Sequence, residues 1–263
     1  MFDLTGKTAL ITGGCGLLGV QHAEAILEFG GEVILTDIVS DTSRVVTLKE
    51  KYGTNVSSVY MDVTDKSSIQ KVVDKFEKID ILINNAALDP KVEDGLEYKN
   101  KFEHLELDSW NKTIDVILNG TFLCSQVVIN KMLSTGLESN YCRYGGVILN
   151  IASDLSIISP DQRIYGDGVK PASYGVAKAG VVNLTKYLST YLAKKNIRVN
   201  SLSPAGVYNG QSDEFVSKFR NLIPMDRMAY PDEYKGAIVF MCSNASSFMT
   251  GHNLIIDGGR TIW

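Results

Sequence analysis

Cysteine and histidine are scarce in this sequence, and neither is clustered. The four cysteines, Cys15, Cys124, Cys142 and Cys242, lie far apart and form no C-x-x-C pair. The three histidines have no neighbouring ligand at metal-binding spacing. Disulfide scaffolds and zinc sites both use more closely spaced residues. The sequence therefore predicts neither a disulfide framework nor a metal site.

Long apolar runs and runs of like charge are also missing. No apolar stretch approaches the ~20 residues that cross a bilayer. The N-terminus has no basic segment followed by an apolar core and a cleavage site. The formal net charge is −4, and lysine and arginine are scattered. These features argue against a membrane or nucleic-acid partner and favour a cytoplasmic protein with a small-molecule substrate.

The sequence does contain the pattern of an α/β protein, with 44% apolar residues in a chain of 263. Short β-branched segments alternate with segments of helical periodicity, which predicts one domain over residues 1–263 with a doubly wound, mostly parallel sheet. The predicted strands are Thr8–Thr12, Glu32–Asp37, Ile79–Asn84, Gly146–Ala152 and Arg198–Leu202. The predicted helices are Gly19–Phe29, Lys66–Lys75, Ser109–Leu133, Ser173–Ala193 and Asp232–Cys242.

Two polar segments, 88–101 and 159–171, interrupt this alternation. Each follows a predicted strand, and the carboxyl ends of parallel strands are where such folds bind ligands. Long loops in compact domains are more often functional than idle. We therefore expect the ligand site at this edge of the sheet.

A glycine-rich loop connects the first predicted strand to the first predicted helix. Its glycines include Gly13, Gly16 and Gly19, and Leu18 precedes the last of them. Glycine permits a tight turn and lets backbone N–H groups approach a pyrophosphate, which the following helix N-terminus also attracts. A plain turn is the alternative, but the position after the first strand favours a dinucleotide site in which these four residues contact the cofactor.

An acidic residue, Asp37, ends the second predicted strand and is followed by Ile38. A carboxylate at this place accepts hydrogen bonds from the ribose hydroxyls of NAD and repels the 2′-phosphate of NADP. The nearest basic residue after it is Arg44, seven positions later. The sequence therefore favours NAD over NADP, with Ile38 beside the adenosine.

Later strand ends carry further candidate cofactor contacts. A further strand, the third in chain order, is expected between Glu32–Asp37 and Ile79–Asn84, and Asp62 and Val63 follow it as candidates to hold the adenine. Asn85 and Ala86 follow the fourth strand and are candidates on the ribose side. An asparagine at a strand end can equally serve the turn itself, so this alternative stays open.

Candidate catalytic residues lie in the second half of the chain. Tyr174 and Lys178 are spaced i, i+4 in a predicted helix, which places them on one face. A nearby ammonium favours the phenolate form of tyrosine, which can then act as a base. Ser153 follows the fifth strand and is expected to donate a hydrogen bond to the substrate oxygen. A turn or capping role for Ser153 is the alternative.

Taken in order, these motifs resemble the short-chain dehydrogenase/reductase family over practically the whole chain. The resemblance implies a single-domain Rossmann fold with a seven-stranded sheet, a nicotinamide cofactor and hydride transfer at a carbon that bears oxygen. It also implies a homotetramer or homodimer packed partly through the helix of Tyr174, with cofactor contacts from Tyr174, Lys178 and Val207. The motifs are the glycine loop, Asp62-Val63, Asn84-Asn85-Ala86, Ser153, Tyr174-x-x-x-Lys178, Pro204-Ala205-Gly206-Val207 and Asp257-Gly258-Gly259.

Three features depart from the family pattern. The glycine spacing TGGxGxxG looks like that of sugar-nucleotide epimerases and dehydratases in the same superfamily. Ile117 stands where the family usually has a catalytic asparagine, and Asn119 is about 200° further around the helix. The segment between Ser153 and Tyr174 is also longer than the family's usual spacing. A proton relay through Lys178 and water is therefore in doubt.

The long segment before Tyr174 is the expected substrate wall. Arg163 and Tyr165 lie in it, and Tyr208 and Asn209 follow the Pro204–Val207 motif. Arg163 is the strongest candidate to bind an anionic group because its guanidinium offers a fork of donors. Solvated loop residues are the alternative. Short sequence segments in this region and at Asn85–Glu93 also resemble those of bacterial flagellin-modification dehydrogenases. This resemblance implies a sugar-like substrate.

Three functions remain open from the sequence. The first is an NAD-dependent dehydrogenase that acts on a secondary alcohol of a sugar or nucleotide sugar. The second is a redox-neutral epimerase or dehydratase with tightly bound NAD, which the glycine spacing suggests. The third is a non-catalytic NAD-binding scaffold, which Ile117 favours and the Ser153, Tyr174 and Lys178 set opposes.

Overall fold

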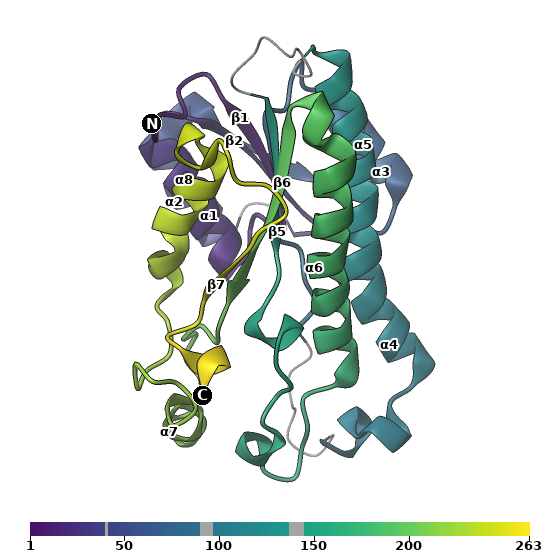
Figure 1. The fold of residues 1–263 in the computed structure, drawn as a ribbon, viewed down its shortest axis with the longest axis vertical. Coiled ribbons are helices and arrows are strands. Elements are labelled where there is room, and N and C mark those ends of the chain that lie inside the picture. Colours follow the sequence, from purple (N-terminus) through teal and green to yellow (C-terminus); the bar gives the residue numbers. More distant parts are fainter. Residues whose placement is uncertain (40–41, 90–96, 137–144) are drawn as a thin grey trace.

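Seven parallel strands form the centre of the protein, shown in Figure 1. The computed structural model describes residues 1–39, 42–89, 97–136 and 145–263. The strand order is β3-β2-β1-β4-β5-β6-β7, which confirms the predicted doubly wound sheet. The strands are β1 (Thr8–Thr12), β2 (Glu32–Asp37), β3 (Val56–Tyr60), β4 (Ile81–Asn84), β5 (Gly146–Ile151), β6 (Ile197–Pro204) and β7 (Asn253–Ile256).

A layer of helices covers each face of the sheet (Figure 1), and a hydrophobic core lies between the sheet and each layer. The central strands are buried along their whole length, which explains their runs of Val, Ile and Leu. One face carries α1 (Leu17–Glu28), α2 (Ser43–Tyr52) and α8 (Lys235–Cys242). The other carries α3 (Lys66–Val73), α4 (Leu107–Ile114), α5 (Gly120–Ser134) and α6 (Ala172–Leu192), while α7 (Asp213–Arg220) lies beyond the carboxyl edge of the sheet.

All five predicted strands and all five predicted helices are present with small shifts at their ends. The strands β3 and β7 and the helices α2 and α7 lie outside the predicted ranges. The predicted helix Ser109–Leu133 is divided by a π-helical turn at Asp115–Asn119 between α4 and α5. After this turn Gly120 packs against Val63, where a Cβ atom would come within 2.9 Å of the valine Cγ2.

The segment Leu107–Ser134 is the one helical run, among the described residues, that is long and apolar enough to cross a membrane. From the sequence we expected no apolar stretch of the ~20 residues that cross a bilayer. Half of its most apolar window is buried inside the fold, and α5 supplies Val127, Val128 and Met132 to a hydrophobic core. This is the pattern of a core helix, so the run is weak support for a membrane span.

The topology places a crevice at the carboxyl ends of β1 and β4. These two strands are neighbours in the sheet, yet the helices that follow them, α1 and α4, lie on opposite faces. Connections that leave a sheet in opposite directions open a ligand crevice at that point. The site is expected there.

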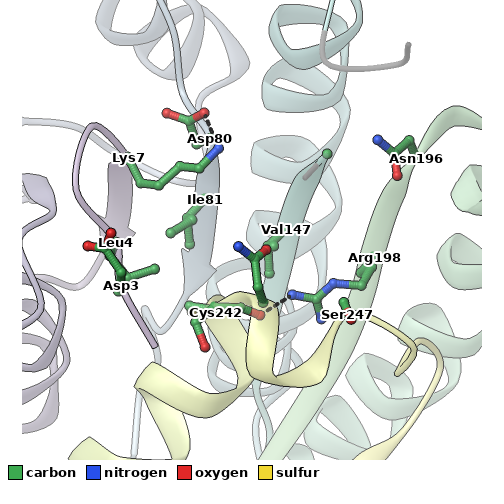
Figure 2. A pocket seen from close by; sticks show the side chains of 13 residues that line it. Asp3, Leu4, Lys7, Asp80, Ile81, Val147, Asn196, Arg198, Cys242 and Ser247 are labelled. Atoms are coloured by element: carbon green, nitrogen blue, oxygen red, sulfur yellow. Dashed lines mark hydrogen bonds and ion pairs between the residues drawn. The ribbon is translucent and has the colours of Figure 1, made fainter. Parts of the chain in front are cut away.

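A pocket also exists at the opposite, amino-terminal edge of the sheet, shown in Figure 2. Its charged groups are already paired. The Lys7 Nζ lies 3.3 Å from Asp80 Oδ1, and Arg198 donates to the carbonyl oxygens of Met241 and Ser243. These contacts hold Lys7, Asp80 and Arg198 in the structure of this edge of the sheet.

His22 is fully buried on α1. Neither ring nitrogen makes a hydrogen bond of good geometry within the described part of the chain. Burial lowers the pKa of His22 to about 3, and the Asn85 amide opposes this shift only in part. The imidazole of the folded protein therefore stays neutral down to about pH 3, whereas that of the unfolded chain takes up its proton below about pH 6.5.

This burial predicts an acid-induced loss of stability. Below pH 6.5 the unfolded chain binds a proton at His22 that the folded chain does not, until the pH reaches about 3. Stability should therefore fall by about 1.4 kcal/mol per pH unit in this window. Urea unfolding of the wild type and His22→Phe at pH 7 and pH 5 measures this slope, since both proteins share every carboxylate. Equal slopes for the two proteins would refute the prediction.

Candidate active site

The glycine loop forms a close-packed cradle at the carboxyl end of β1. Gly13 has a φ of +59°, and a Cβ atom there would lie 2.8 Å from the Cα of Ala86. A Cβ at Gly19 would lie 2.3 Å from the carbonyl oxygen of Gly13. Gly16 is the N-cap of α1 and offers no side-chain oxygen to the N–H groups of the first helical turn. These N–H groups and the open backbone fit a dinucleotide pyrophosphate.

Asp37 lies beside this cradle at the end of β2. Its Oδ2 accepts a hydrogen bond from the Cys15 N–H at 3.2 Å, and its Oδ1 accepts one from the Val39 N–H at 3.2 Å. Ile38, the next residue, is 61% exposed, while Leu18 packs on the core behind the loop. The carboxylate thus joins β2 to the glycine loop and stands where the adenosine ribose is expected.

Asn85 braces the loop with its own side chain. Its Nδ2 donates to the carbonyl oxygens of Thr12 and Gly13, both at 3.0 Å. The Thr12 Oγ1 accepts from the N–H groups of Asn85 and Ala86. The Asn85 amide thus stabilises the local backbone in this structure, as the alternative to a cofactor contact proposes, because its N–H groups donate to the glycine loop.

The Asp62-Val63 pair forms part of a neighbouring wall. Asp62 accepts hydrogen bonds from the N–H and the hydroxyl of Thr64, at 2.8 and 2.7 Å. Val63 is buried against Gly120 at the start of α5. Val207 packs on the core near the β6 end, where it bridges to Ala229. The carboxylate of Asp62 is thus hydrogen-bonded within its own turn, and Val63 is the apolar residue of this wall.

Tyr174 and Lys178 lie on the same face of α6, as their spacing predicts. The Lys178 Nζ is 5.8 Å from the centre of the Tyr174 ring and donates to the Ile151 carbonyl oxygen at 2.6 Å. Lys178 is 3% exposed, and this burial lowers its pKa to about 8. The carbonyl oxygen at the end of β5 therefore holds the Lys178 ammonium near the Tyr174 ring.

The pKa of Tyr174 is raised well above its ordinary value. Burial is the largest cause, and the carboxylate of Asp89 adds to it. A side-chain hydrogen bond with Ser153 acts in the opposite direction. Tyr174 is therefore a neutral phenol in this structure, and a proton-accepting role requires added positive charge nearby.

The Ser153 hydroxyl is oriented by its neighbours. Its Oγ donates to Asp154 Oδ1 at 2.8 Å and accepts from the Leu155 N–H at 3.2 Å. Asp154 in turn is ion-paired with Arg260, and both are nearly fully buried. From the sequence we expected this hydroxyl to donate to substrate, and its contacts with Asp154 and Leu155 were not predicted. Arg260 lies 106 residues from Asp154, and no spacing rule connects them.

Lys170 is a second cation beside Tyr174. Its Nζ lies 4.6 Å from the centre of the Tyr174 ring and is ion-paired with Asp89. The Gln162 side chain holds the Lys170 backbone, because it accepts from the N–H and donates to the carbonyl. The long segment between Ser153 and Tyr174 thus brings a charge to the site. The sequence predicts that this segment, with Lys170 in it, lies beside the active site, but not that Lys170 contacts Tyr174.

The expected anion-binding role of Arg163 is not supported by its geometry. Its fork of donors is already occupied by Asp161, with Nε to Oδ1 at 2.8 Å. The side chain of Arg163 is 87% exposed. Tyr165 packs on Phe215 with ring centres 5.9 Å apart, and burial raises its pKa to about 12. Two of the guanidinium's donors are thus directed at Asp161, and anion binding by Arg163 stays a prediction.

Tyr208 and Asn209 lie on an exposed turn after β6. Tyr208 is 44% exposed and its N–H donates to the Ala229 carbonyl at 2.8 Å. The Asn209 N–H donates to Gln211 Oε1 at 2.7 Å. Both of these hydrogen bonds use backbone N–H groups of the turn. The predicted substrate contacts of the two side chains stay predictions.

Ile117 is 1% exposed and packs with Ala152, Ala177 and Tyr174. Asn119 instead points to Asp115, with Nδ2 to Oδ1 at 2.7 Å, on the exposed side of the helix. An apolar wall therefore stands where the family usually has an amide. The structure offers no substitute from Asn119 for the proton relay.

The arrangement as a whole combines a dinucleotide cradle with a tyrosine, a lysine and a serine at the same edge of the sheet. Within residues 1–39, 42–89, 97–136 and 145–263, no group of three His, Cys, Asp or Glu side chains could hold a metal ion. The charged groups around the phenol are Lys170, Lys178, Asp89 and Asp154. This set suits proton exchange with a substrate oxygen beside a bound nicotinamide.

The comparisons with known proteins agree with this geometry. Residues 17–261 match the family model described as enoyl-(acyl carrier protein) reductase. The chain is 34% identical over 273 residues to an NAD-dependent glycerol dehydrogenase of Listeria innocua, with 99% of this chain and 96% of the relative covered.

Two solved structures share the fold over nearly all of both chains. A short-chain dehydrogenase from Leptospira borgpetersenii with bound NAD+ superposes with a TM-score of 0.85 at 32% identity, covering 99% of this chain and 94% of that one. A gluconate 5-dehydrogenase from Burkholderia cenocepacia in complex with NADP and tartrate gives a TM-score of 0.83 at 27% identity, covering 99% and 97%. The chain therefore belongs to the short-chain dehydrogenase/reductase family and is an oxidoreductase of that family.

Proposed function

We propose that this protein oxidises a secondary alcohol of a polyol or sugar-like substrate to the ketone, with NAD as the hydride acceptor. The observation that carries the proposal is the meeting of Tyr174, Lys178 and Ser153 beside the glycine cradle. The Lys178 ammonium stands 5.8 Å from the centre of the phenol ring, and the Ser153 side chain acts against the burial that raises the pKa of Tyr174. Proton transfer from the substrate oxygen and hydride transfer from the carbon that bears it can then occur within one site.

Each residue has a distinct role in this proposal. Tyr174 exchanges the proton of the substrate hydroxyl, because its phenol is a titratable group on the same face of α6 as the Lys178 ammonium. Lys178 stabilises the phenolate and, once the cofactor adds its positive charge, helps to offset the burial that raises the pKa of Tyr174. Bound NAD would supply the hydride-accepting ring.

A polyol is the favoured substrate class because the wall around Tyr174 is polar. Lys170, Asp89 and Gln162 come together there through the long segment before α6. The glycerol dehydrogenase relative and the gluconate 5-dehydrogenase neighbour also act, by their names, on polyhydroxylated compounds. The narrower resemblance to flagellin-modification dehydrogenases stays a prediction, and residues 90–93 of its strings lie outside the described part of the chain.

The test is formation of NADH from NAD with glycerol, threitol, gluconate and nucleotide sugars, beside simple secondary alcohols. We expect NADH with at least one polyhydroxylated substrate. Product from a sugar with no net NADH would instead support the redox-neutral epimerase or dehydratase. Tight NAD binding without any product would support the non-catalytic scaffold and overturn the proposal.

We infer a preference for NAD over NADP from Asp37, whose carboxylate already holds the Cys15 N–H at the adenosine end. Removing this carboxylate in Asp37→Ala should lower the affinity for NAD by about tenfold, which corresponds to the loss of one or two charged hydrogen bonds. NADP affinity should rise or stay the same, because the repulsion of its 2′-phosphate is lost. Calorimetric titration with each cofactor measures both. An unchanged NAD to NADP ratio would remove Asp37 from the selectivity argument.

We also propose that α5 and α6 form a contact between copies of the chain. Apolar side chains on these helices are exposed, among them Phe122, Val176, Tyr187 and Tyr191 at 48%, 50%, 64% and 55%. Exposed apolar groups gathered on neighbouring helices are typical of protein interfaces. Sedimentation analysis should show a dimer or tetramer, and a monomer at micromolar concentration would contradict this.

A further inference from the structure

Lys170 and Asp89 form an ion pair beside Tyr174 that has no part in the proton transfer or the hydride transfer. Lys170 lies in the long segment between Ser153 and Tyr174, and Asp89 lies in the segment that follows β4. Two segments far apart in the chain thus bring one positive and one negative group to the phenol. The pair is placed to contact the substrate beside its reacting carbon atom.

The ammonium of Lys170 is held in place by the fold. The side chain of Lys170 is only 11% exposed, and its Nζ lies 4.6 Å from the centre of the Tyr174 ring. The Lys178 Nζ is further from that centre, at 5.8 Å. Gln162 holds the Lys170 backbone at both its N–H and its carbonyl group. The second ammonium therefore stands over the phenol ring before any ligand binds.

Both members of the pair have hydrogen-bonding capacity beyond their mutual contact. An ammonium has three donors, and a carboxylate has two acceptor oxygens. The ion pair joins the Lys170 Nζ to one of these oxygens, Asp89 Oδ1. The Asp89 side chain is 64% exposed, so water reaches the carboxylate and a ligand can displace that water. The pair therefore offers a donor and an acceptor side by side.

This combination suits a neutral hydroxyl group, which donates one hydrogen bond and accepts others. The pair is neutral as a unit, so a substrate carboxylate would be attracted by Lys170 and repelled by Asp89. The other carboxylate that acts on the phenol, Asp154, is balanced by its ion pair with Arg260. The charges at this wall therefore favour an uncharged diol over a hydroxy acid.

We propose that Lys170 and Asp89 determine substrate specificity by binding the hydroxyl on the carbon next to the reacting one, so that the site selects an uncharged vicinal diol. The neighbouring hydroxyl donates to Asp89 and accepts from Lys170, while the reacting hydroxyl gives its proton to Tyr174. The inference rests on the proposed function and narrows its substrate class. A monohydric alcohol lacks the second hydroxyl, and a hydroxy acid brings a charge of the same sign as Asp89.

The test uses propan-2-ol, propane-1,2-diol and lactate, which share the reacting carbon and its methyl group and differ in one substituent. Dissociation constants are measured by calorimetry with NADH bound, a complex that cannot oxidise an alcohol. For the wild type we expect the diol to bind about tenfold more tightly than propan-2-ol, the gain from charge-assisted hydrogen bonds to one more hydroxyl. Lactate should bind no more tightly than propan-2-ol. All three compounds meet the same phenol, so a change in the pKa of Tyr174 cancels in these ratios.

Two variants test the two charges separately. Lys170→Met removes the ammonium and keeps an apolar side chain, and it should raise the dissociation constant of the diol to that of propan-2-ol. Asp89→Asn removes the negative charge at an exposed position, and it should strengthen lactate relative to the diol by about tenfold. Lys186→Met is the matched control, because Lys186 is an exposed lysine further along α6. It should leave all three dissociation constants unchanged, and circular dichroism with thermal unfolding checks the fold of each variant.

A wild type that binds the diol no more tightly than propan-2-ol would overturn the inference, as would a diol preference that survives in folded Lys170→Met. Tighter wild-type binding of lactate than of the diol would overturn it in favour of an anionic substrate. An unchanged ratio of lactate to diol in Asp89→Asn would remove Asp89 from the site. Failure of the whole polyol panel to yield NADH would instead count against the proposed function, because the calorimetric constants do not depend on turnover.

Discussion

Tyr174→Phe is expected to lower the turnover number by about 10²–10⁴-fold, the range for loss of a general acid–base group. The substitution removes the phenol oxygen and nothing else. Ring packing against Ile117 and Ala177 remains, and Lys178 keeps its hydrogen bond to the Ile151 carbonyl. NAD affinity should therefore change little, while the proton of the substrate hydroxyl loses its acceptor.

The measurement is a steady-state assay with the best substrate of the polyol panel, beside calorimetric titration of NAD. Tyr187→Phe is the control, because Tyr187 lies on the same helix and is 64% exposed. It should keep wild-type turnover. Retention of more than about a tenth of wild-type activity by Tyr174→Phe would remove the tyrosine from the chemical step.

Gly19→Ala should lower the affinity for NAD by about 100-fold or more, a loss of roughly 2.7 kcal/mol of binding free energy. The new Cβ would lie 2.3 Å from the Gly13 carbonyl oxygen and 2.7 Å from the Gly14 Cα. Both are backbone atoms, so the loop must move as a unit to relieve the contact. That movement displaces the N–H groups that face the pyrophosphate.

A glycine elsewhere separates this effect from a general effect of substitution. Gly236 lies in α8, and a Cβ there would meet nothing within 4 Å. Gly236→Ala should leave NAD affinity unchanged and raise stability by about 0.5–1 kcal/mol, because alanine loses less backbone entropy in a helix. Calorimetry and urea unfolding give both numbers for both variants. Near-wild-type NAD affinity in Gly19→Ala would show that the cradle does not bind the cofactor.

The sequence predicted those parts of the site that depend on local geometry. Strand and helix periods are short-range properties, and they located β1, β2, α1 and α6 within a few residues. The i, i+4 spacing of Tyr174 and Lys178 fixed their common face in advance, since helix geometry alone decides it. The glycine cluster after the first strand likewise marked the cradle, because close backbone approach requires glycine.

Short or weakly patterned elements were missed for a physical reason. The strands β3 and β7 are four or five residues long and only partly buried, so their residues show no continuous apolar run. The π turn at Asp115–Asn119 interrupts a segment whose apolar period still reads as one helix. Local pattern cannot show such an irregularity, because packing of Gly120 on Val63 involves residues far apart in the chain.

Partner choice was decided only by the tertiary structure. The sequence singled out Arg163 for an anionic ligand, yet its fork is occupied by Asp161 two residues away. It named Ser153 as a donor, yet the fold brings Arg260 to Asp154 and commits the hydroxyl proton. The sequence by itself thus determined which chemical groups lie at the carboxyl edge of the sheet. Which of them are already paired, and which way their protons point, depends on long-range contacts that only the folded chain creates.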